Sequence, residues 1–344
     1  MKVGIIGATG YGGVELIRIL YLHPHVTSFS VYSSSMAGKK IDESYPHFYG
    51  MPLTLQPIDP KKIAEDVDVV FCATPSGVSA EVVPELLEEG VPVIDLSGDF
   101  RLKNREEYKQ WYQKNPAPQQ YLDQAIYGLT EWVEEKLEGA TFISNPGCFP
   151  TATLLGLGPL LKNDLIEVDS IIIDAKSGVS GAGRSLSLKA HYGERNEDLS
   201  IYKLNHHQHI PEIEQMLRRW NQDVAPITFS THLVPMTRGI MVTMYAKAKK
   251  SVTEKQLRDI YKEKYDHHYF IGVRPEGVFP TTKEVYGSNF CDIGVTIDER
   301  TGRITVVSVI DNLMKGAAGQ AVQNFNMMFG FDEKAGLDFM PIYP

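Results

Sequence analysis

A single cysteine stands in the segment 144–151, which reads SNPGCFPT and comes just before the apolar run 151–161. The turn residues before Cys148 and the proline at position 150 predict that a helix begins there. A helix N-terminus favours the thiolate, which is the nucleophilic form of cysteine. Cys148 is therefore a candidate nucleophile, although most unpaired cysteines are small buried hydrophobic residues.

A second cluster of reactive side chains is the segment 205–212, NHHQHIPE, which comes before a predicted helix. No cysteine or carboxylate stands at a spacing typical of metal ligands, so no metal site is predicted. Surface imidazoles are the unreactive interpretation. Beside a reactive cysteine, His207 or His209 would hold the thiolate and later move a proton, and Glu212 would orient the ring.

Arginines follow small-residue loops at two places in the second half of the chain. The segment 177–184, SGVSGAGR, ends in Arg184, and the segment 235–239, PMTRG, contains Arg238. The first loop is able to cradle a phosphate through backbone N–H groups, and the alternative is a flexible connection. Guanidinium groups bind phosphate and carboxylate well, but the sequence does not assign one arginine to each.

The N-terminal residues carry a nucleotide-binding pattern. A β-branched run at 2–6 is followed by Gly7-x-x-Gly10-x-x-Gly13 and then by a helical pattern at 14–20. Glycines let the backbone approach a pyrophosphate, and the helix N-terminus faces it. The pattern therefore predicts a dinucleotide site, with a merely structural turn as the alternative.

The second predicted strand, 26–32, should end at the residue that contacts the adenosine ribose. NAD enzymes usually carry Asp or Glu there, whereas this chain has Ser33, Ser34 and Ser35, followed by Lys39 and Lys40. Hydroxyl groups and lysines suit a 2′-phosphate, and no carboxylate repels it. The pattern favours NADP over NAD, and a polar loop without a ligand is the alternative.

Further apolar runs at 67–73, 91–96 and 141–144 are typical of strands buried in a parallel sheet. Ligands of such sheets lie at the carboxyl ends of the strands. Thr74, Ser76, Ser97 and Arg101 are therefore candidates to line a cleft, and the last strand should deliver Cys148 to the same edge.

After residue 161 the pattern changes to longer strands and hairpins, including a hairpin at 290–297 and 303–310. We predict an α/β protein with an N-terminal Rossmann-type doubly wound sheet and an α+β substrate and oligomerisation domain. The expected boundaries are 1–147 for the NADP-binding domain and 148–310 for the catalytic domain. Residues 311–344 are expected to form a C-terminal helix that returns to the first domain.

Bulk composition excludes several classes of protein. The 344 residues carry a net charge of -9 without a basic run, which argues against a nucleic-acid partner. Three widely spaced cysteines make no disulfide framework and suit a reducing, cytoplasmic setting. No charged and apolar leader opens the chain and no apolar run approaches about 18 residues, so we expect neither an export signal nor a membrane span.

With these motifs together, the chain resembles the N-acetyl-γ-glutamyl-phosphate reductase family, within the wider glyceraldehyde-3-phosphate and aspartate-semialdehyde dehydrogenase group. The resemblance runs nearly end to end. Thr130 stands where the family often has proline, and Gln208 where it often has arginine. The motifs that carry it are GATGYGGVEL at 7–16, SSSMAGK at 33–39, DLSGDFRL at 95–102, SNPGCFPTA at 144–152, SGVSGAGR at 177–184, HQHIPEI at 207–213, HLVPMTRGI at 232–240 and DNLMKGAAGQAVQN at 311–324.

The resemblance implies an NADP-dependent acyl-phosphate oxidoreductase of arginine biosynthesis. Cys148 would form a thioester from N-acetyl-γ-glutamyl phosphate and release inorganic phosphate, and NADPH would reduce the thioester to N-acetylglutamate 5-semialdehyde. His207 or His209 would move the proton, and Asn145 would help to stabilise the oxyanion. A homodimer or homotetramer is expected. The rivals are a reductase of β-aspartyl or N-acetyl-aminoadipyl phosphate, and a non-catalytic NADP-sensing regulator.

The motifs and the resemblance together give the residues that are expected to bind ligands. The expected cofactor residues are Gly7, Thr9, Gly10, Tyr11, Gly12, Gly13, Ser33, Ser34, Ser35, Lys39, Thr74, Ser180, Gly181, Asn312 and Gly316. The expected substrate residues are Arg101, Ser177, Arg184 and Arg238.

Overall fold

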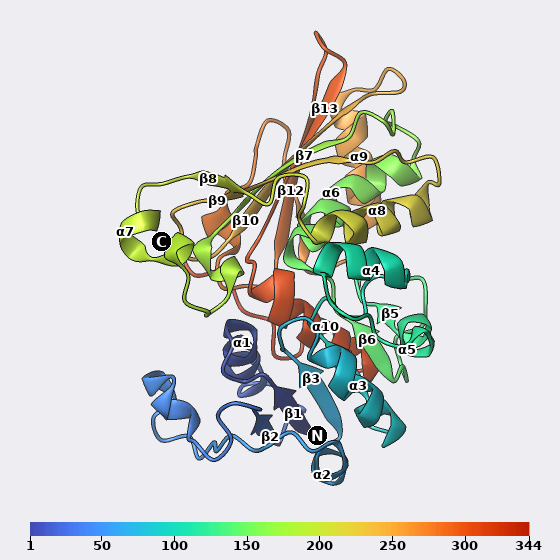
Figure 1. Cartoon of the computed structure of the whole chain (residues 1–344). Helices are drawn as coiled ribbons and strands as arrows, with labels where there is room; N and C mark the ends of the chain where they lie inside the picture. Colours follow the sequence, from blue (N-terminus) through green and yellow to red (C-terminus); the bar gives the residue numbers. More distant parts are fainter. Residues whose placement is uncertain (344) are drawn as a thin grey trace. The chain divides into compact units, whose positions relative to one another are not determined.

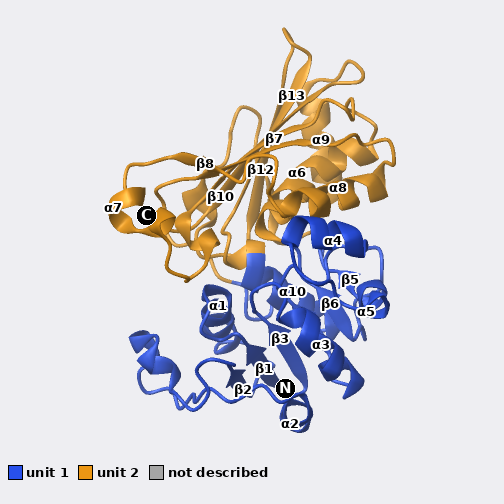
Figure 2. Cartoon of the chain, viewed as in Figure 1, with its two compact units in different colours: residues 1–146, 317–338 blue, residues 147–316, 339–344 orange. Residues whose placement is uncertain are grey.

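The structure is a computed structural model of the chain and describes residues 1–343. The chain divides into two compact units (Figure 2). Unit 1 contains residues 1–146 and 317–338, and unit 2 contains residues 147–316 and the C-terminal residues from 339. The chain therefore leaves unit 1 after Pro146 and re-enters it after Gly316.

Unit 1 is built on a six-stranded sheet with the order β2-β1-β3-β4-β6-β5, in which every pair of neighbours is parallel (Figure 1). The strand order reverses beside β1, so the predicted Rossmann-type doubly wound sheet is confirmed. The strands are β1 (Lys2–Ile6), β2 (Ser28–Tyr32), β3 (Val69–Cys72), β4 (Val93–Asp95), β5 (Ile126–Tyr127) and β6 (Phe142–Ser144).

Helices connect these strands because their apolar stripes must be buried against the sheet. Leu16, Ile17 and Leu20 of α1 are buried in this way. Helix α10 packs against α1 and β4, so the C-terminal part of the chain completes unit 1. The helices of unit 1 are α1 (Tyr11–Leu20), α2 (Pro60–Asp66), α3 (Ser79–Glu88), α4 (Arg105–Tyr112), α5 (Gln119–Gln124) and α10 (Gly319–Met328).

Unit 2 is built on a seven-stranded mixed sheet with the order β11-β12-β13-β10-β7-β9-β8. The predicted hairpin is confirmed, because Cys291 pairs with Ile310 and Asp298 with Arg303. Both β9 and β10 pair with β7, which separates them in the sheet. The strands are β7 (Ile172–Ser177), β8 (Ser200–Tyr202), β9 (Thr228–Leu233), β10 (Ile240–Lys247), β11 (Ile271–Val273), β12 (Cys291–Asp298) and β13 (Arg303–Ile310).

Helix α6 (Cys148–Lys162) lies on the sheet of unit 2 and is buried from Phe149 to Leu161. It packs against β10 and β13, while α8 (His209–Trp220) and α9 (Glu254–Tyr265) pack against it. A methyl group at Gly156 would come within 2.3 Å of the Met244 side chain, so the helix approaches the sheet closely. This packing fixes the start of α6, where Cys148 lies.

A π-helical turn, Met314–Ala318, precedes α10 where an uninterrupted helix was expected. A short helix α7 (Tyr192–Arg195) belongs to unit 2. Across residues 1–343, no helix is both long and apolar enough to span a bilayer.

Candidate active site

Cys148 is the first residue of α6, and Gly147 before it has the extended backbone of an N-cap (φ -69°, ψ 157°). No side chain caps this helix end, so its positive end acts on the sulfur. Cys148 is partly exposed, whereas Cys72 and Cys291 are buried. Burial, with nearby carboxylates, raises the pKa of the Cys72 thiol well above its usual value. Cys148 is thus the accessible thiol of the described chain.

Glu212 lies in the first turn of α8 and is fully buried. Its Oε1 accepts a hydrogen bond from the Gly147 backbone N–H at 2.8 Å. The structure therefore places this carboxylate against the backbone that leads into Cys148. It holds the N-cap of α6, whereas the sequence suggested that it orients an imidazole ring.

His207 is 4% exposed, and its ring is surrounded by the rings of Phe149, Tyr202 and Phe229 at centroid distances of 5.3–5.7 Å. Burial lowers the pKa of His207 to about 3, and the Lys203 charge adds to the effect. Its Nδ1 accepts the His209 backbone N–H at 3.1 Å, so the ring proton lies on Nε2. His207 is neutral at physiological pH.

His209 is the first residue of α8, and its ring centroid lies 4.7 Å from that of His207. The same ring makes an edge contact with Phe149, the residue after Cys148. The two histidines thus share an aromatic neighbour, and the His207 ring also accepts the His209 backbone N–H. Tyr202 lies here too: burial raises its pKa, and the Cys148 thiolate adds to that shift.

Gly316 lies in the π-helical turn and packs directly against the cysteine. A methyl group at this position would come within 2.8 Å of the Cys148 Cβ and 3.2 Å of its Cα. Real Cβ atoms do not approach so closely, so the backbone can take this path only with glycine. The π turn therefore forms one wall beside the sulfur-bearing residue.

Asn312 joins the two small-residue loops of unit 2. Its Oδ1 accepts the Gly239 N–H at 2.8 Å, and its Nδ2 donates to the Ser180 Oγ at 3.0 Å. The loops also run together, since the N–H groups of Gly178 and Ser180 donate to backbone oxygens of Gly239 and Thr237. The structure thus brings the expected Ser180, Asn312 and the loop of Arg238 together.

The remaining ligand candidates of unit 2 differ in exposure. Ser177 is buried, and its hydroxyl donates to the Gly178 carbonyl at 3.1 Å. Gly181 approaches the same hydroxyl, because a Cβ there would lie 2.8 Å from it. Arg184 is exposed at the end of the loop.

The glycine turn of unit 1 fits a dinucleotide phosphate. Gly7 has a φ of +84°, and a Cβ there would lie 2.4 Å from the Ala73 carbonyl oxygen. A Cβ on Gly13 would lie 2.5 Å from the Gly7 oxygen. Gly10 is the N-cap of α1, no side chain caps this end, and Tyr11 and Gly12 follow it as the first helical residues. The result is a backbone cradle at a helix N-terminus, which suits a pyrophosphate.

The other cofactor candidates of unit 1 lie at strand ends. Ser33 is buried and its Oγ accepts the Met36 N–H, whereas Ser34, Ser35 and Lys39 are exposed. The Thr74 hydroxyl pairs with that of Ser79 at 2.8 Å. The Thr9 carbonyl accepts a bond from the Tyr45 hydroxyl at 3.0 Å. Exposed hydroxyls and an ammonium group therefore follow β2.

Arg101 and Asn145 make bonds within the framework of unit 1. The Arg101 Nε donates to the Asn145 carbonyl at 2.8 Å, and its Nη2 donates to the Leu96 carbonyl at 2.7 Å. The Asn145 Nδ2 donates to the Ala317 carbonyl at 3.2 Å, and its Oδ1 accepts from Asn324 at 3.0 Å. The sequence suggested a substrate contact and an oxyanion contact, whereas these bonds hold the chain just before Pro146.

Two buried carboxylates were not singled out from the sequence. Asp99 accepts the N–H groups of Gly77 and Ala80 and the Tyr108 hydroxyl, so it fixes the loop after β3. Asp311 plays a comparable part after β13. Burial and the charge of Asp99 raise the pKa of nearby Asp95 to about 6. The available signal was an acidic residue close after an apolar strand, directly after β13 for Asp311 and four residues after β4 for Asp99.

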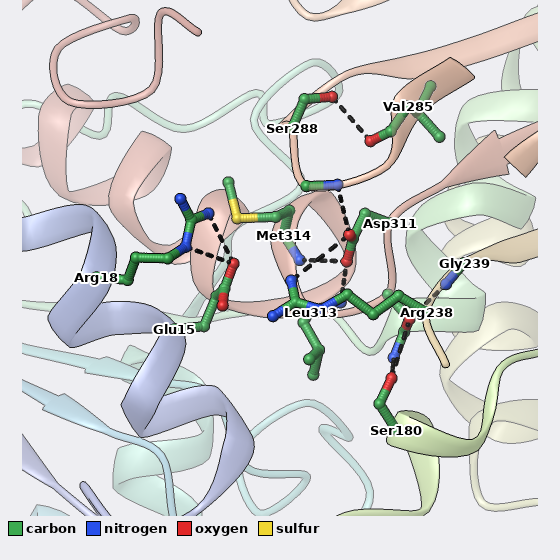
Figure 3. Close-up of polar contacts among 12 residues, drawn as sticks. Glu15, Arg18, Ser180, Arg238, Gly239, Val285, Ser288, Asp311, Leu313 and Met314 are labelled. Atoms are coloured by element: carbon green, nitrogen blue, oxygen red, sulfur yellow. Dashed lines mark hydrogen bonds and ion pairs between the residues drawn. The ribbon is translucent and has the colours of Figure 1, made fainter. Parts of the chain in front are cut away.

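The Asp311 side chain is fully buried and joins several segments (Figure 3). Its Oδ1 accepts the N–H groups of Leu313 and Met314 at 2.8 and 3.1 Å. Its Oδ2 accepts the Gly287 N–H at 2.8 Å and lies 3.6 Å from the Arg238 Nη1. Across residues 1–343, no group of three or more His, Cys, Asp or Glu side chains is arranged to hold a metal ion.

A Rossmann-type unit with a glycine cradle, joined to a mixed-sheet unit whose first helix begins with an accessible cysteine, defines a thiol-dependent dehydrogenase. Two family models match the two parts. Residues 2–140 match the NAD binding domain of semialdehyde dehydrogenase, and residues 148–312 match its dimerisation domain.

Relatives with full-length similarity define the family more narrowly. Proteins of Geobacillus sp. (strain WCH70) and Geobacillus stearothermophilus are each 61% identical, and one of Bacillus subtilis (strain 168) is 55% identical, with 100% of both chains covered. Each is named N-acetyl-gamma-glutamyl-phosphate reductase. The chain belongs to the N-acetyl-γ-glutamyl-phosphate reductase family, as its motifs predicted.

Solved structures show the same fold at low identity. Aspartate semialdehyde dehydrogenase II of Vibrio cholerae, complexed with ASA, matches with a TM-score of 0.70 at 19% identity, covering 95% of this chain and 97% of that chain. The enzyme of Candida albicans with NADP matches with a TM-score of 0.67 at 17% identity, covering 97% and 98%.

Proposed function

We propose that this chain reduces N-acetyl-γ-glutamyl phosphate to N-acetylglutamate 5-semialdehyde, with release of inorganic phosphate, as a step of arginine biosynthesis. The observation that carries the proposal is Cys148 itself, the accessible thiol at the uncapped start of α6. Relatives that carry this name are similar to the chain over its whole length. A thiolate at such a position suits covalent catalysis on an acyl carbon.

Unit 1 would hold the cofactor. The residues proposed to bind NADP are the glycine turn 7–13, the exposed Ser34, Ser35 and Lys39, and Thr74. The lack of a carboxylate after β2, together with exposed hydroxyls and a lysine, supports NADP over NAD. When bound, NADPH supplies the hydride that reduces the thioester.

Unit 2 would carry the covalent chemistry. The Cys148 thiolate attacks the acyl carbon, a C–S bond forms, and the bond from that carbon to the phosphate oxygen breaks. Reduction of the thioester gives a hemithioacetal oxyanion, which collapses to the aldehyde and returns the thiolate. Backbone N–H groups at the start of α6 would stabilise the oxyanions, a contribution of about 3 kcal/mol per donor. Arg184 and Arg238 would bind the phosphate and carboxylate of the substrate.

His209 is our candidate for the acid/base. It would take the proton of the Cys148 thiol before the attack, which leaves the thiolate, and would later donate this proton to the departing phosphate. His207 is less suited, because its Nδ1 accepts the His209 N–H and its pKa is held at about 3. A group of that basicity does not take a thiol proton near neutral pH. His207 would instead fix the backbone from which the His209 ring projects.

The reverse reaction tests the proposal. Reduction of NADP by N-acetylglutamate 5-semialdehyde should require phosphate or arsenate. The acyl group leaves the Cys148 thioester when an oxygen of one of these anions attacks the acyl carbon. Phosphate-independent reduction would indicate an ordinary aldehyde dehydrogenase and would contradict the proposal. Comparing the forward specificity constants for N-acetyl-γ-glutamyl, N-acetyl-aminoadipyl and β-aspartyl phosphates shows which substrate the enzyme prefers. This measurement is needed because one methylene changes binding by only about 1–3 kcal/mol.

We also propose that the chain assembles as a homodimer or homotetramer through unit 2. The match to a dimerisation domain supports this assembly. Apolar side chains exposed between β7 and α8, which include Leu186, Leu188, Tyr192 and Leu199, support it as well. Light scattering on the purified protein measures the assembly size. Three free cysteines suit a reducing compartment, so the proposed location is the cytoplasm.

A further inference from the structure

The Asp311 carboxylate contacts both a candidate substrate arginine and the turn beside the nucleophile. It pairs with Arg238 at 3.6 Å and caps the N–H groups of Leu313 and Met314, which lead into the π turn. That turn carries Gly316, whose Cα region packs on Cys148. All of these residues belong to unit 2.

A buried carboxylate is costly unless its charge and its lone pairs are satisfied. Asp311 is fully buried, and three backbone N–H groups and one guanidinium surround it. Three N–H donors alone would satisfy a structural cap, as in many helix starts. The additional ion pair indicates that Asp311 also fixes the position of the Arg238 guanidinium.

Arg238 is only partly shielded, with 21% of its side chain exposed. Its guanidinium is a planar fork, so fixing one end of the fork also fixes the direction of the opposite edge. A fork of fixed direction binds a carboxylate or phosphate through two parallel hydrogen bonds. The Asn312 bond to Gly239 holds the next residue of the same loop.

We infer that Asp311 is a positioning residue of the reductase, which orients Arg238 toward an anionic group of the substrate and sets the turn that backs Cys148. The inference rests on the proposed function. Arg238 binds an anionic group of the substrate, either the carboxylate or the phosphate. Asp311 makes no direct contact with the substrate. Substitution of Asp311 therefore acts through Arg238.

The test compares Asp311→Asn, Arg238→Lys and the double variant with a matched control. Asn keeps an oxygen that accepts the backbone N–H groups but removes the charge, and Lys keeps the charge of Arg238 but removes the fork. Asp292→Asn is the control, because Asp292, which lies on neighbouring β12, also pairs with an arginine, Arg274. Each single variant should raise the KM for the acyl phosphate by about tenfold, with an unchanged KM for NADPH.

The KM of the double variant for the acyl phosphate should be no higher than that of the poorer single variant, because both changes disrupt the same Asp311–Arg238 pair. Asp292→Asn should leave both KM values unchanged. A KM for the acyl phosphate equal to wild type in Arg238→Lys overturns the inference, and so do additive effects in the double variant. Arg238→Lys keeps the buried pair neutral, so it remains informative if Asp311→Asn does not fold.

A binding measurement separates this inference from the proposed function. Iodoacetamide should alkylate Cys148, since Cys72 and Cys291 are buried. In wild type, inorganic phosphate or N-acetylglutamate should slow this alkylation, and in Arg238→Lys about tenfold more of one of them should be needed. The affected anion identifies the group that Arg238 binds. Equal protection of wild type and variant by both anions overturns the inference, whereas a wild-type enzyme that needs no phosphate in the reverse assay contradicts the function alone.

Discussion

Helices α1 of unit 1 and α6 of unit 2 begin in the same way. Each has a glycine N-cap with an extended backbone, Gly10 and Gly147, and neither has a side-chain cap. The residues that follow differ. After Gly10 come a tyrosine and two glycines, whereas after Gly147 comes Cys148, which carries a thiol at the first helical position.

The supports of the two helix ends differ as well. The turn before α1 is held by backbone contacts at Gly7 and Gly13, where no Cβ would fit. The start of α6 is held by side chains, since Glu212 accepts the Gly147 N–H and the turn under Asp311 brings Gly316 to Cys148. In the proposed function, one electrostatic feature serves ligand binding in unit 1 and thiolate formation in unit 2, and substitutions should separate the two uses.

The largest effect is expected for Cys148→Ser. Serine is a far weaker nucleophile without a matched base, so kcat should fall by roughly 10⁴-fold or more. The glycine cradle of unit 1 is untouched, and NADP binding measured by calorimetry should persist. Turnover near the wild-type rate in the purified variant would rule out the covalent mechanism.

The same small change in each unit should give opposite results. Gly316→Ala places a methyl group within 2.8 Å of the Cys148 Cβ and should lower kcat by about 100-fold through misplacement of the sulfur. Gly13→Ala meets the Gly7 oxygen at 2.5 Å and should instead weaken NADP binding. The measurements are calorimetric binding and the iodoacetamide alkylation rate of Cys148. If both variants lose cofactor affinity alike, the proposed division between the units is wrong.

A coenzyme test concerns the loop after β2. Ser34→Asp places a carboxylate on an exposed position of this loop, which would repel a 2′-phosphate, so the KM for NADPH should rise by about tenfold and that for NADH should change little. Steady-state kinetics with both coenzymes measure the ratio. Ser34→Asn is a matched control of similar size without added charge. Equal use of NADH and NADPH by the wild type would contradict the assignment of this loop.

The last expected effect concerns stability rather than activity, and it is a pH dependence of the free energy of unfolding. The folded-state pKa of His207 is lowered to about 3, below its value of about 6.5 in the unfolded chain. The unfolded chain therefore binds the proton first, and the stabilisation present above pH 6.5 is lost as the pH falls toward 3. At pH 5 the loss is about 2 kcal/mol.

Urea denaturation at pH 8 and pH 5 measures this loss. The free energy of unfolding of His207→Gln should fall less between pH 8 and pH 5 than that of the wild type, because the variant removes one protonation from the unfolded state. An identical fall in both proteins would show that His207 is not buried in its neutral form.

Much of the fold was predictable because local patterns determine it. The strand, glycine turn and helix at the N-terminus and the hairpin of β12 and β13 depend on periodicity and turn chemistry. The place of β7 between β9 and β10 was not predictable, because pairing of distant strands leaves no local pattern. The π turn before α10 likewise depends on Asp311 and on its contacts with Gly287 and Arg238.

The site was predictable as a set of residue types, and less so as a set of contacts. Motifs singled out the cysteine, the histidine pair and the arginines as candidates, and their roles stay predictions. The bonds of Arg101 to the carbonyls of Leu96 and Asn145, and of Glu212 to Gly147, join residues far apart in the chain. Such bonds arise only when the strands are assembled, so the sequence could not distinguish a group that binds a ligand from one that holds the backbone.

The return of the chain to unit 1 after Gly316 has a consequence for synthesis. Helix α10 packs on α1 and β4 and is part of unit 1. It is synthesised after nearly all of unit 2, so unit 1 cannot complete its packing until then. Until then the apolar face of β4 that α10 covers has no native partner. A chain that stalls before residue 317 should therefore have an incomplete unit 1 with exposed apolar surface. Such a chain is expected to aggregate or to bind chaperones.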